Sequence, residues 1–246
     1  MNGLFAIILA TSSISFLSLS GVMLLFLRED LFRRLSIFLV AFAAGTLMGV
    51  AFLDLLPEAV GMLDELGNSF VFILIGFLTF FLIEKTLHWH HTHRADPKHA
   101  PLGMLSLVGD AFHNFIDGII LAAIFLVDVR LGMAATVAVA LHEIPQEISE
   151  FGVLVYSGFS RQRALFLNFI SATTVIVGGV VGFFLVGAMI QWLPLFLLFA
   201  VGTFLYLAAS DFVPEIRKEE GVARSIQIFL IFVAGLLFMW LLSLVE

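Results

Sequence analysis

A short stretch of the sequence, HEIPQE at residues 142–147, contains four side chains that could bind a metal ion. His142 and Gln146 lie four residues apart, as do Glu143 and Glu147, so a helix would place each pair on one face. The flanking segments, LGMAATVAVA and VLVYSGF, are apolar. Polar side chains inside an apolar segment need a partner that offsets the free-energy cost of burying them.

A second stretch, SLVGDAFHNFIDGIILAAIF, repeats the combination. Asp110, His113 and Asp117 follow spacings of three and four and therefore share a helical face, with Asn114 beside them. The two stretches together offer two imidazoles, several carboxylates and two amides. Such a mixed nitrogen and oxygen set suits Zn²⁺, Fe²⁺, Mn²⁺ or Co²⁺ better than Cu⁺. Histidine and carboxylate at helical spacing on two facing helices is typical of metal sites in bundles.

The composition places these stretches in a membrane protein. The chain has 246 residues, of which 61% are hydrophobic and 13% charged, and its mean hydropathy is +1.11. These values exclude an ordinary soluble domain. Eight apolar runs are each long enough to cross a bilayer, so we expect an all-α membrane protein with eight transmembrane helices in a single domain, residues 1–246. The runs are 3–27, 35–60, 69–88, 104–127, 132–157, 162–190, 194–216 and 225–245.

The acidic residues of the two central runs are costly in this setting. A charged residue at the centre of a membrane helix costs roughly 2.5–3.5 kcal/mol, so Asp117, Glu143 and Glu147 together cost about 7–10 kcal/mol. Neither polar stretch contains Lys or Arg. The remaining partners are protons, water and an external cation. The alternative interpretation is that these side chains pair with one another, protonated, as contacts between helices.

The positions of the basic residues predict the orientation in the membrane. Eleven of the twelve Lys and Arg fall in the segments joining runs 1–2, 3–4, 5–6 and 7–8, and only Arg130 falls on the other side. The positive-inside rule then places both termini outside the cytoplasm. The first run is long and lacks a basic start, so we expect a retained helix instead of a cleaved signal peptide. The absence of cysteine excludes disulfides and thiolate metal ligands.

A sequence pattern near two helix ends indicates an internal repeat. The second run ends in DLLPEA (54–59) and the seventh in DFVPEI (211–216). In the expected orientation these two D-x-x-P-E patterns lie at opposite membrane faces. This favours an inverted repeat in which helices 1–3 and helices 6–8 surround a central pair, helices 4 and 5. Acidic groups there would concentrate cations at both mouths. A chance match of two short patterns is the alternative.

The motifs HNFIDG (113–118) and HEIPQE (142–147) resemble the paired motifs of the ZIP family, the Zrt- and Irt-like divalent-metal transporters. The likeness extends to NFISA (168–172) and FLYLAASDFVPEI (204–216). The resemblance implies eight helices with outside termini, a histidine-rich cytoplasmic loop at about 88–102, and transport toward the cytoplasm through a site between helices 4 and 5. Zn²⁺ is the expected cargo, with Fe²⁺, Mn²⁺ and Co²⁺ as alternatives.

Carried over residue by residue, the resemblance implies seven ligands: His113, Asn114, Asp117, His142, Glu143, Gln146 and Glu147. Asn168 is a lesser candidate. The chain departs from the most similar subgroup, which has HEIPHE, because Gln146 replaces a histidine with a neutral, weaker ligand. This departure predicts one site formed by His113, Asp117 and His142 with Glu143 or Glu147, instead of two. No catalytic cofactor is expected, since the bound ion is the cargo.

The rival interpretation is an intramembrane metal-dependent hydrolase. HEIPQE begins like the HExxH helix of zinc peptidases, but Gln146 stands where the second histidine would be. A metal sensor that does not transport is a third possibility. The loop histidines could capture or sense metal, or belong to a solvated connector.

We predict a transporter and not an enzyme. We expect a multi-pass protein of the plasma or inner membrane. Its expected partners are divalent metal ions and the lipid bilayer, with no nucleic acid, and homodimerisation is left open.

Overall fold

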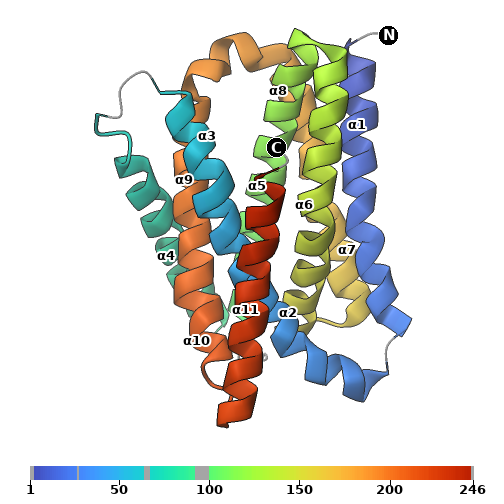
Figure 1. Ribbon diagram of the computed structural model, residues 1–246, viewed down its shortest axis with the longest axis vertical. Coiled ribbons are helices and arrows are strands. Elements are labelled where there is room, and N and C mark those ends of the chain that lie inside the picture. The colour runs from blue at the N-terminus through green and yellow to red at the C-terminus, as the bar shows by residue number, and fades with distance from the viewer. Residues whose placement is uncertain (1–2, 27, 64–66, 92–99, 245–246) are drawn as a thin grey trace.

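The computed structural model describes residues 3–26, 28–63, 67–91 and 100–244, and within these ranges it contains helices and no β-strand. The helices form an elongated bundle, with the two chain ends toward the same end of it (Figure 1). The predicted all-α class is confirmed. The part of the predicted histidine-rich loop at residues 92–99 lies outside the described residues.

The elements follow one another with short connections. In chain order they are α1 (Gly3–Leu17), the 3₁₀ segment η1 (Ser18–Phe26), α2 (Glu29–Gly49), the π-helical η2 (Val50–Leu55), α3 (Leu56–Gly61), α4 (Val71–His91), α5 (Ala100–Val127), α6 (Val129–Tyr156), α7 (Arg161–Ala172), α8 (Thr174–Met189), the 3₁₀ turn η3 (Ile190–Trp192), α9 (Leu193–Tyr206), the π-helical η4 (Leu207–Phe212), α10 (Val213–Ile216) and α11 (Val222–Leu242).

Six segments in the described part of the chain are long and apolar enough to cross a membrane: Gly3–Met23, Leu35–Gly61, Leu102–Val127, Arg161–Leu185, Leu193–Ile216 and Val222–Leu242. Each coincides with one of the eight predicted runs. The other two runs correspond to α4 and α6, which are 21 and 28 residues long but do not belong to this set. The multi-pass membrane class is therefore supported.

The sixth predicted run is divided, which the sequence did not lead us to expect. Its helix is interrupted at Thr173, between α7 and α8. Thr173 Oγ1 donates to the carbonyl of Ile170 (2.6 Å), and Thr174 Oγ1 lies 2.7 Å from the carbonyls of both Ser171 and Ala111. Hydroxyls that bond to preceding carbonyls bend helices, so this pair explains the interruption and attaches the bend to α5.

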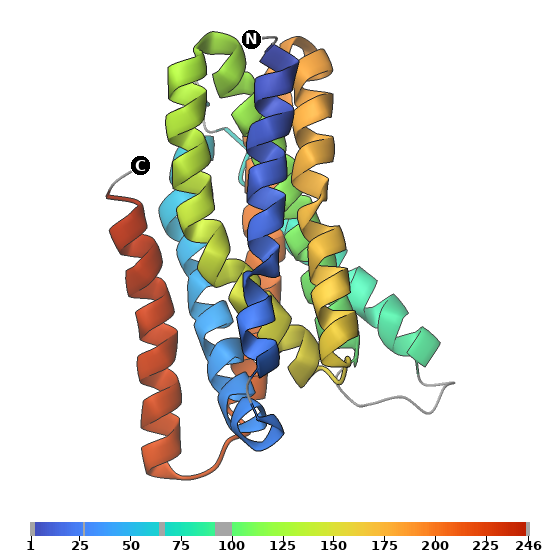
Figure 2. The same cartoon turned by 90° about the vertical axis from the view of Figure 1, so that its right-hand side faces the viewer.

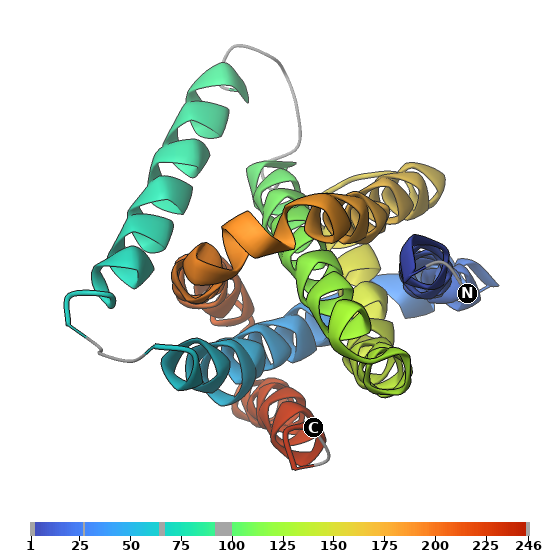
Figure 3. The ribbon, with the colours of Figure 1, turned by 90° about the horizontal axis from the view of Figure 1, so that it is seen from above.

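Helices α5 and α6 form an antiparallel hairpin in the middle of the bundle (Figure 3). Asp128 alone separates them, and its Oδ1 accepts the amides of Arg130 (2.7 Å) and Leu131 (3.1 Å), capping α6. His113 lies fifteen residues before Asp128 and His142 fourteen residues after it. At 1.5 Å per residue both are about 21–22 Å from the turn, so the hairpin places the two polar stretches at one level.

The outer helices α11 and α4 pack closely against their neighbours α2 and α9 through glycine. A Cβ at Gly45 of α2 would lie 2.1 Å from the carbonyl oxygen of Phe232 in α11, and one at Gly76 of α4 would lie 2.1 Å from that of Phe199 in α9. Only glycine permits such backbone contact. Helices α4 and α11 stand at the periphery (Figures 2 and 3), while α8 packs along α5 and α1.

The two D-x-x-P-E patterns coincide with the two π-helical segments. Asp54 lies in η2 and Asp211 in η4, and each segment is followed by a helix whose second residue is proline, Pro57 or Pro214. Proline lacks an amide hydrogen and displaces the carbonyl four residues before it. The backbone accommodates this by widening locally, which is typical of π-bulges at functional sites.

Candidate metal centre

Four buried side chains from the middle of the α5–α6 hairpin lie close enough together to hold one metal ion. His113 and Asp117 belong to α5, and His142 and Glu143 to α6; one ligand atom from each lies within 4.8 Å of the other three. None of the four is more than 5% exposed. They come from the two stretches whose spacing predicted shared helical faces.

Imidazole nitrogens and carboxylate oxygens alternate around this cluster. His113 Nε2 lies 3.5 Å from Asp117 Oδ2 and 3.6 Å from Glu143 Oε1, and His142 Nε2 lies 3.4 and 3.8 Å from the same two oxygens. In a tetrahedral zinc site with bonds of about 2.0–2.1 Å, neighbouring ligand atoms are about 3.3 Å apart. The four nitrogen–oxygen distances therefore exceed those of a tetrahedral site by about 0.1–0.5 Å.

The electrostatics of the cluster favour a cation. Helix α5 contains no Lys or Arg, and the only one in α6 is Arg130 in its first turn. Among the described residues, no hydrogen bond reaches either oxygen of Glu143 or either ring nitrogen of His113. Buried acceptors without partners are costly, and carboxylates especially so. A divalent ion would satisfy these atoms at once.

A cleft leads to the centre from the α3 side of the bundle. Its volume is ≈ 590 Å³, and Asp117 and His142 of the centre form part of its wall. Asp54 and Glu58 line the same cleft. Two acidic residues predicted to lie at a mouth of the pathway thus line the same cleft as two side chains of the metal centre. Their negative charge would attract a cation into the cleft.

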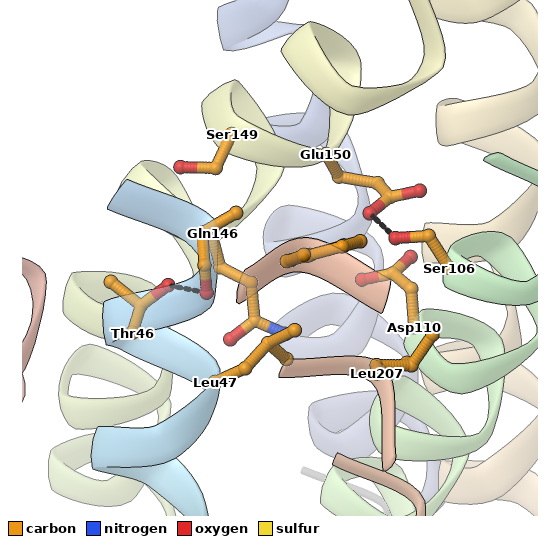
Figure 4. Close-up of a pocket in the computed structure, with 10 residues that line it drawn as sticks. Thr46, Leu47, Ser106, Asp110, Gln146, Ser149, Glu150 and Leu207 are labelled. Carbon is orange, nitrogen blue, oxygen red and sulfur yellow. Dashed lines mark hydrogen bonds between the residues drawn. The ribbon is translucent and has the colours of Figure 1, made fainter. Parts of the chain in front are cut away.

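The other predicted ligands are buried in the same part of the bundle. Asn114 donates its Nδ2 to the carbonyl of Asp110 (3.2 Å), and Asn168 donates to the carbonyl of Glu147 (3.2 Å). The carboxyl group of Glu147 lies beside Glu143. Gln146 lines a narrow chamber on the opposite side of the centre from the cleft (Figure 4).

Several polar contacts on that opposite side were not predicted from the sequence. Ser106 donates its hydroxyl to Glu150, and Tyr156 donates its hydroxyl to Glu215 Oε1 at 2.5 Å. The other oxygen of Glu215 is paired with Lys218. These contacts connect α5 to α6, and α6 to α10, in the part of the bundle beyond the metal centre. No local spacing signals them, because the partners are 44 and 59 residues apart.

Comparison with known proteins agrees with the motif resemblance. The family model described as "ZIP Zinc transporter" matches residues 4–104 and 91–243. Zinc transporter ZIP13 of Pongo abelii is 32% identical to this chain over 84% of it, and the metal cation symporter ZIP14 of Xenopus tropicalis is 30% identical over 93% of it. Zinc transporter ZIP13 of Homo sapiens is 30% identical over 84% of the chain.

The alignments cover a large part of the relatives as well. The chain spans about two thirds of the length of these proteins: 66% of the first two and 70% of the human one. The relatives are named as transporters, which supports a non-enzymatic role. Because the family model matches nearly the whole sequence, the chain belongs to the ZIP family of zinc transporters.

Proposed function

We propose that this protein transports a divalent transition metal across a membrane toward the cytoplasm, with Zn²⁺ as the substrate and Fe²⁺, Mn²⁺ and Co²⁺ as alternatives. The observation that carries the proposal is the buried cluster of His113, Asp117, His142 and Glu143 at the end of an acidic cleft. Two imidazoles and two carboxylates are a typical ligand set for zinc. Family membership supports the same function.

These four residues are the proposed primary ligands. The remaining predicted ligands, Asn114, Gln146 and Glu147, are buried in the same two helices and would bind the ion as it enters or leaves the centre. We propose a single nitrogen-containing site, because both imidazoles of the hairpin are used in it. The hydrolase alternative gains no support, since Gln146 stands where HExxH has its second histidine.

The proposed architecture is one domain over residues 1–246 with eight membrane crossings. Six are the apolar segments described above, and α4 and α6 are the other two. Inverted repeats are supported by matching details. Gly45 lies nine residues before Asp54, and Gly202 nine residues before Asp211. Gly45 packs on the backbone of α11 and Gly202 on that of α4. The third helix of each proposed repeat thus packs against the second helix of the other repeat, and a glycine of that second helix makes the contact in both cases.

The proposed mechanism is alternating access. In this conformation the cleft reaches the metal centre from one side. On the other side Tyr156 of α6 donates its hydroxyl to Glu215 of α10, whose other oxygen is paired with Lys218. The metal would lose its water to the ligands of α5 and α6. It would then be released when α5 and α6 move against the repeats and the Tyr156–Glu215 contact separates. The proline-associated π segments η2 and η4 are the proposed flexible points.

Uptake of radioactive zinc into proteoliposomes tests the function. We expect His113→Ala/His142→Ala to abolish uptake, because both nitrogen ligands are lost. The matched control, His91→Ala/His93→Ala, removes two histidines from the loop region and should transport at the wild-type rate. Both variants should elute as the wild type does in size-exclusion chromatography. Wild-type uptake no faster than leakage into empty liposomes, for zinc and for iron, would overturn the proposal.

A further inference from the structure

A groove opens on the outside of the bundle, between α10 and the first half of α11. Its volume is ≈ 440 Å³, within the range of about 300–1,000 Å³ that is typical of small-molecule sites. Helix α11 stands at the edge of the bundle (Figure 2), and Phe229 in the wall of the groove is 62% exposed. The groove is therefore open to whatever surrounds the protein.

The groove has a polar end and an apolar end. On α11 its wall contains Ser225, Ile228 and Phe232, which share one helical face. The other wall contains Val213 and Arg217, four residues apart. Arg217 and Ser225 lie next to the loop that joins α10 to α11, whereas Phe232 lies about 10 Å further along α11 at 1.5 Å per residue. A ligand that fits this groove has a polar head and an apolar chain.

The polar end lies at the limit of the membrane-spanning segments. Arg217 directly follows the apolar segment Leu193–Ile216, and Ser225 is the fourth residue of the segment Val222–Leu242. The apolar end of the groove extends into the second of these segments. A membrane protein presents such a face to the bilayer, with its polar end at the level of the lipid headgroups. The surrounding molecules that can fill the groove are therefore lipids.

Arg217 is the one charged residue that the described walls of the groove contain. In the described part of the chain, no hydrogen bond or ion pair is found for its guanidinium. The neighbouring bases differ in this respect, because Lys218 is paired with Glu215, and Arg224 with Glu219 at 3.3 Å. A guanidinium carries five donors in a planar fork that matches the geometry of phosphate.

The charge at the polar end selects among phospholipids. A zwitterionic headgroup would bring its own cation close to Arg217, whereas an anionic headgroup presents only negative charge. Glu220, on the connecting loop, is exposed and does not line the groove. Basic pockets between membrane helices are typical sites for anionic headgroups.

We propose that the groove between α10 and α11 binds an anionic phospholipid, with its phosphate on Arg217 and one acyl chain along Ile228 and Phe229. The lipid would bridge α10 and α11. Because Glu215 of α10 accepts the hydroxyl of Tyr156, the lipid stabilises the element that makes this contact. The inference needs only the membrane location of the chain and does not depend on the proposed transport function.

Native mass spectrometry of the delipidated full-length protein tests the site. Phosphatidylglycerol and phosphatidylcholine with identical acyl chains are titrated separately. We expect the first phosphatidylglycerol to bind at least about fivefold more tightly, which is the effect of one basic residue near a membrane surface. Arg217→Gln should remove this difference, and Arg217→Lys should retain most of it. The matched control is Arg163→Gln, since Arg163 is exposed and lies over the ring of Phe159, outside the groove; it should leave the difference unchanged.

A second variant blocks the groove without removing its charge. Ser225→Trp places a large ring between the walls at an exposed position and should weaken the binding of the first phosphatidylglycerol at least about fivefold. Equal affinities for the two lipids in the wild type would overturn the inference, as would an unchanged preference in Arg217→Gln. A dimer in the same spectra that Ser225→Trp dissociates would show that a second copy of the chain occupies the groove, and would also overturn it.

Hydrogen exchange in lipid nanodiscs locates the bound lipid. The amides of α10 and of the first turns of α11 should exchange more slowly in phosphatidylglycerol than in phosphatidylcholine. The amides of α1 should show no such difference, since the groove does not contact α1. In Arg217→Gln the two lipids should give equal rates in α10. Slower exchange in phosphatidylglycerol that persists in this variant would place the lipid elsewhere and contradict the inference. If Arg217→Gln fails to fold, Ser225→Trp makes the same comparison.

Discussion

Replacing Asp117 with asparagine removes one of the two charged ligands of the metal centre and keeps the size of the side chain. Asp117 Oδ2 lies 3.5 Å from His113 Nε2 and 3.4 Å from His142 Nε2, so the lost charge sits between both imidazoles. Loss of an outer-shell partner alone lowers metal affinity roughly 10- to 100-fold. We expect at least that change in the zinc dissociation constant, which corresponds to about 1.4–2.7 kcal/mol.

The same substitution should not lower the thermal stability of the metal-free protein. An aspartate near the centre of a membrane helix costs about 2.5–3.5 kcal/mol on insertion scales, and asparagine has no charge to bury. Its amide oxygen can still accept a hydrogen bond from an imidazole. The metal-free Asp117→Asn variant should therefore have a Tm equal to or above that of the wild type.

Thermal unfolding with and without zinc measures both effects. Zinc at 100 times the wild-type Kd should stabilise the wild type by about 2.7 kcal/mol and the variant by only about 0.4–1.4 kcal/mol. At about 2–4 °C per kcal/mol for a chain of this size, the zinc-induced rise in Tm falls from about 5–11 °C to about 1–6 °C. Asp128→Asn is the matched control, because asparagine caps a helix as well as aspartate does and Asp128 lies outside the centre.

Equal zinc-induced rises in Tm for Asp117→Asn and the wild type would refute the assignment of Asp117 as a ligand. A marked drop in the metal-free Tm of the variant would show instead that the carboxylate supports the fold. Only a smaller zinc effect combined with an undiminished metal-free stability agrees with a metal centre made of buried, uncompensated charges.

Three further predictions concern the cleft, the Tyr156–Glu215 contact and the helix packing. Glu58→Gln should raise KM for zinc at low ionic strength and leave kcat unchanged, because Glu58 attracts the ion into the cleft; uptake kinetics at two salt concentrations check this. Tyr156→Phe removes a hydrogen bond to the Glu215 carboxylate worth about 1.5–3 kcal/mol, so hydrogen exchange of the α10 amides should become faster. Gly76→Ala should lower Tm through a clash with α9 that costs about 1–3 kcal/mol, whereas Gly61→Ala, where nothing lies within 4 Å of the new Cβ, should not.

The sequence allowed the helical class and the core of the candidate site to be predicted. Spacings of three and four put His113 and Asp117 on one face, and hydropathy placed them in the same kind of apolar segment as His142. The single-residue turn at Asp128 then sets the level at which the two stretches meet. These relations are local in sequence, and local periodicity is what a single sequence records most clearly.

The division of the predicted ligands into a centre and a chamber could not be predicted in this way. Gln146 shares a helical face with His142, yet four residues span about 6 Å along the axis, which is enough to place it in a different cavity. Which side chains meet there depends on residues from α2 and η4 as well as on α5. The π-helical segments were not predicted either. Pro57 and Pro214 are visible in the sequence, but a proline alone does not indicate whether a helix kinks, ends or widens.

X-ray absorption at the zinc edge tests the central claim most directly, namely that two imidazoles and two carboxylates of the hairpin bind the transported ion. The measurement uses protein loaded with one zinc equivalent, with the loop histidines at positions 88, 90, 91, 93 and 99 replaced by alanine. We predict four nitrogen and oxygen ligands at about 2.0–2.1 Å and imidazole scattering that disappears in His113→Ala/His142→Ala. A shell of six oxygens without imidazole, unchanged in that variant, would contradict the account.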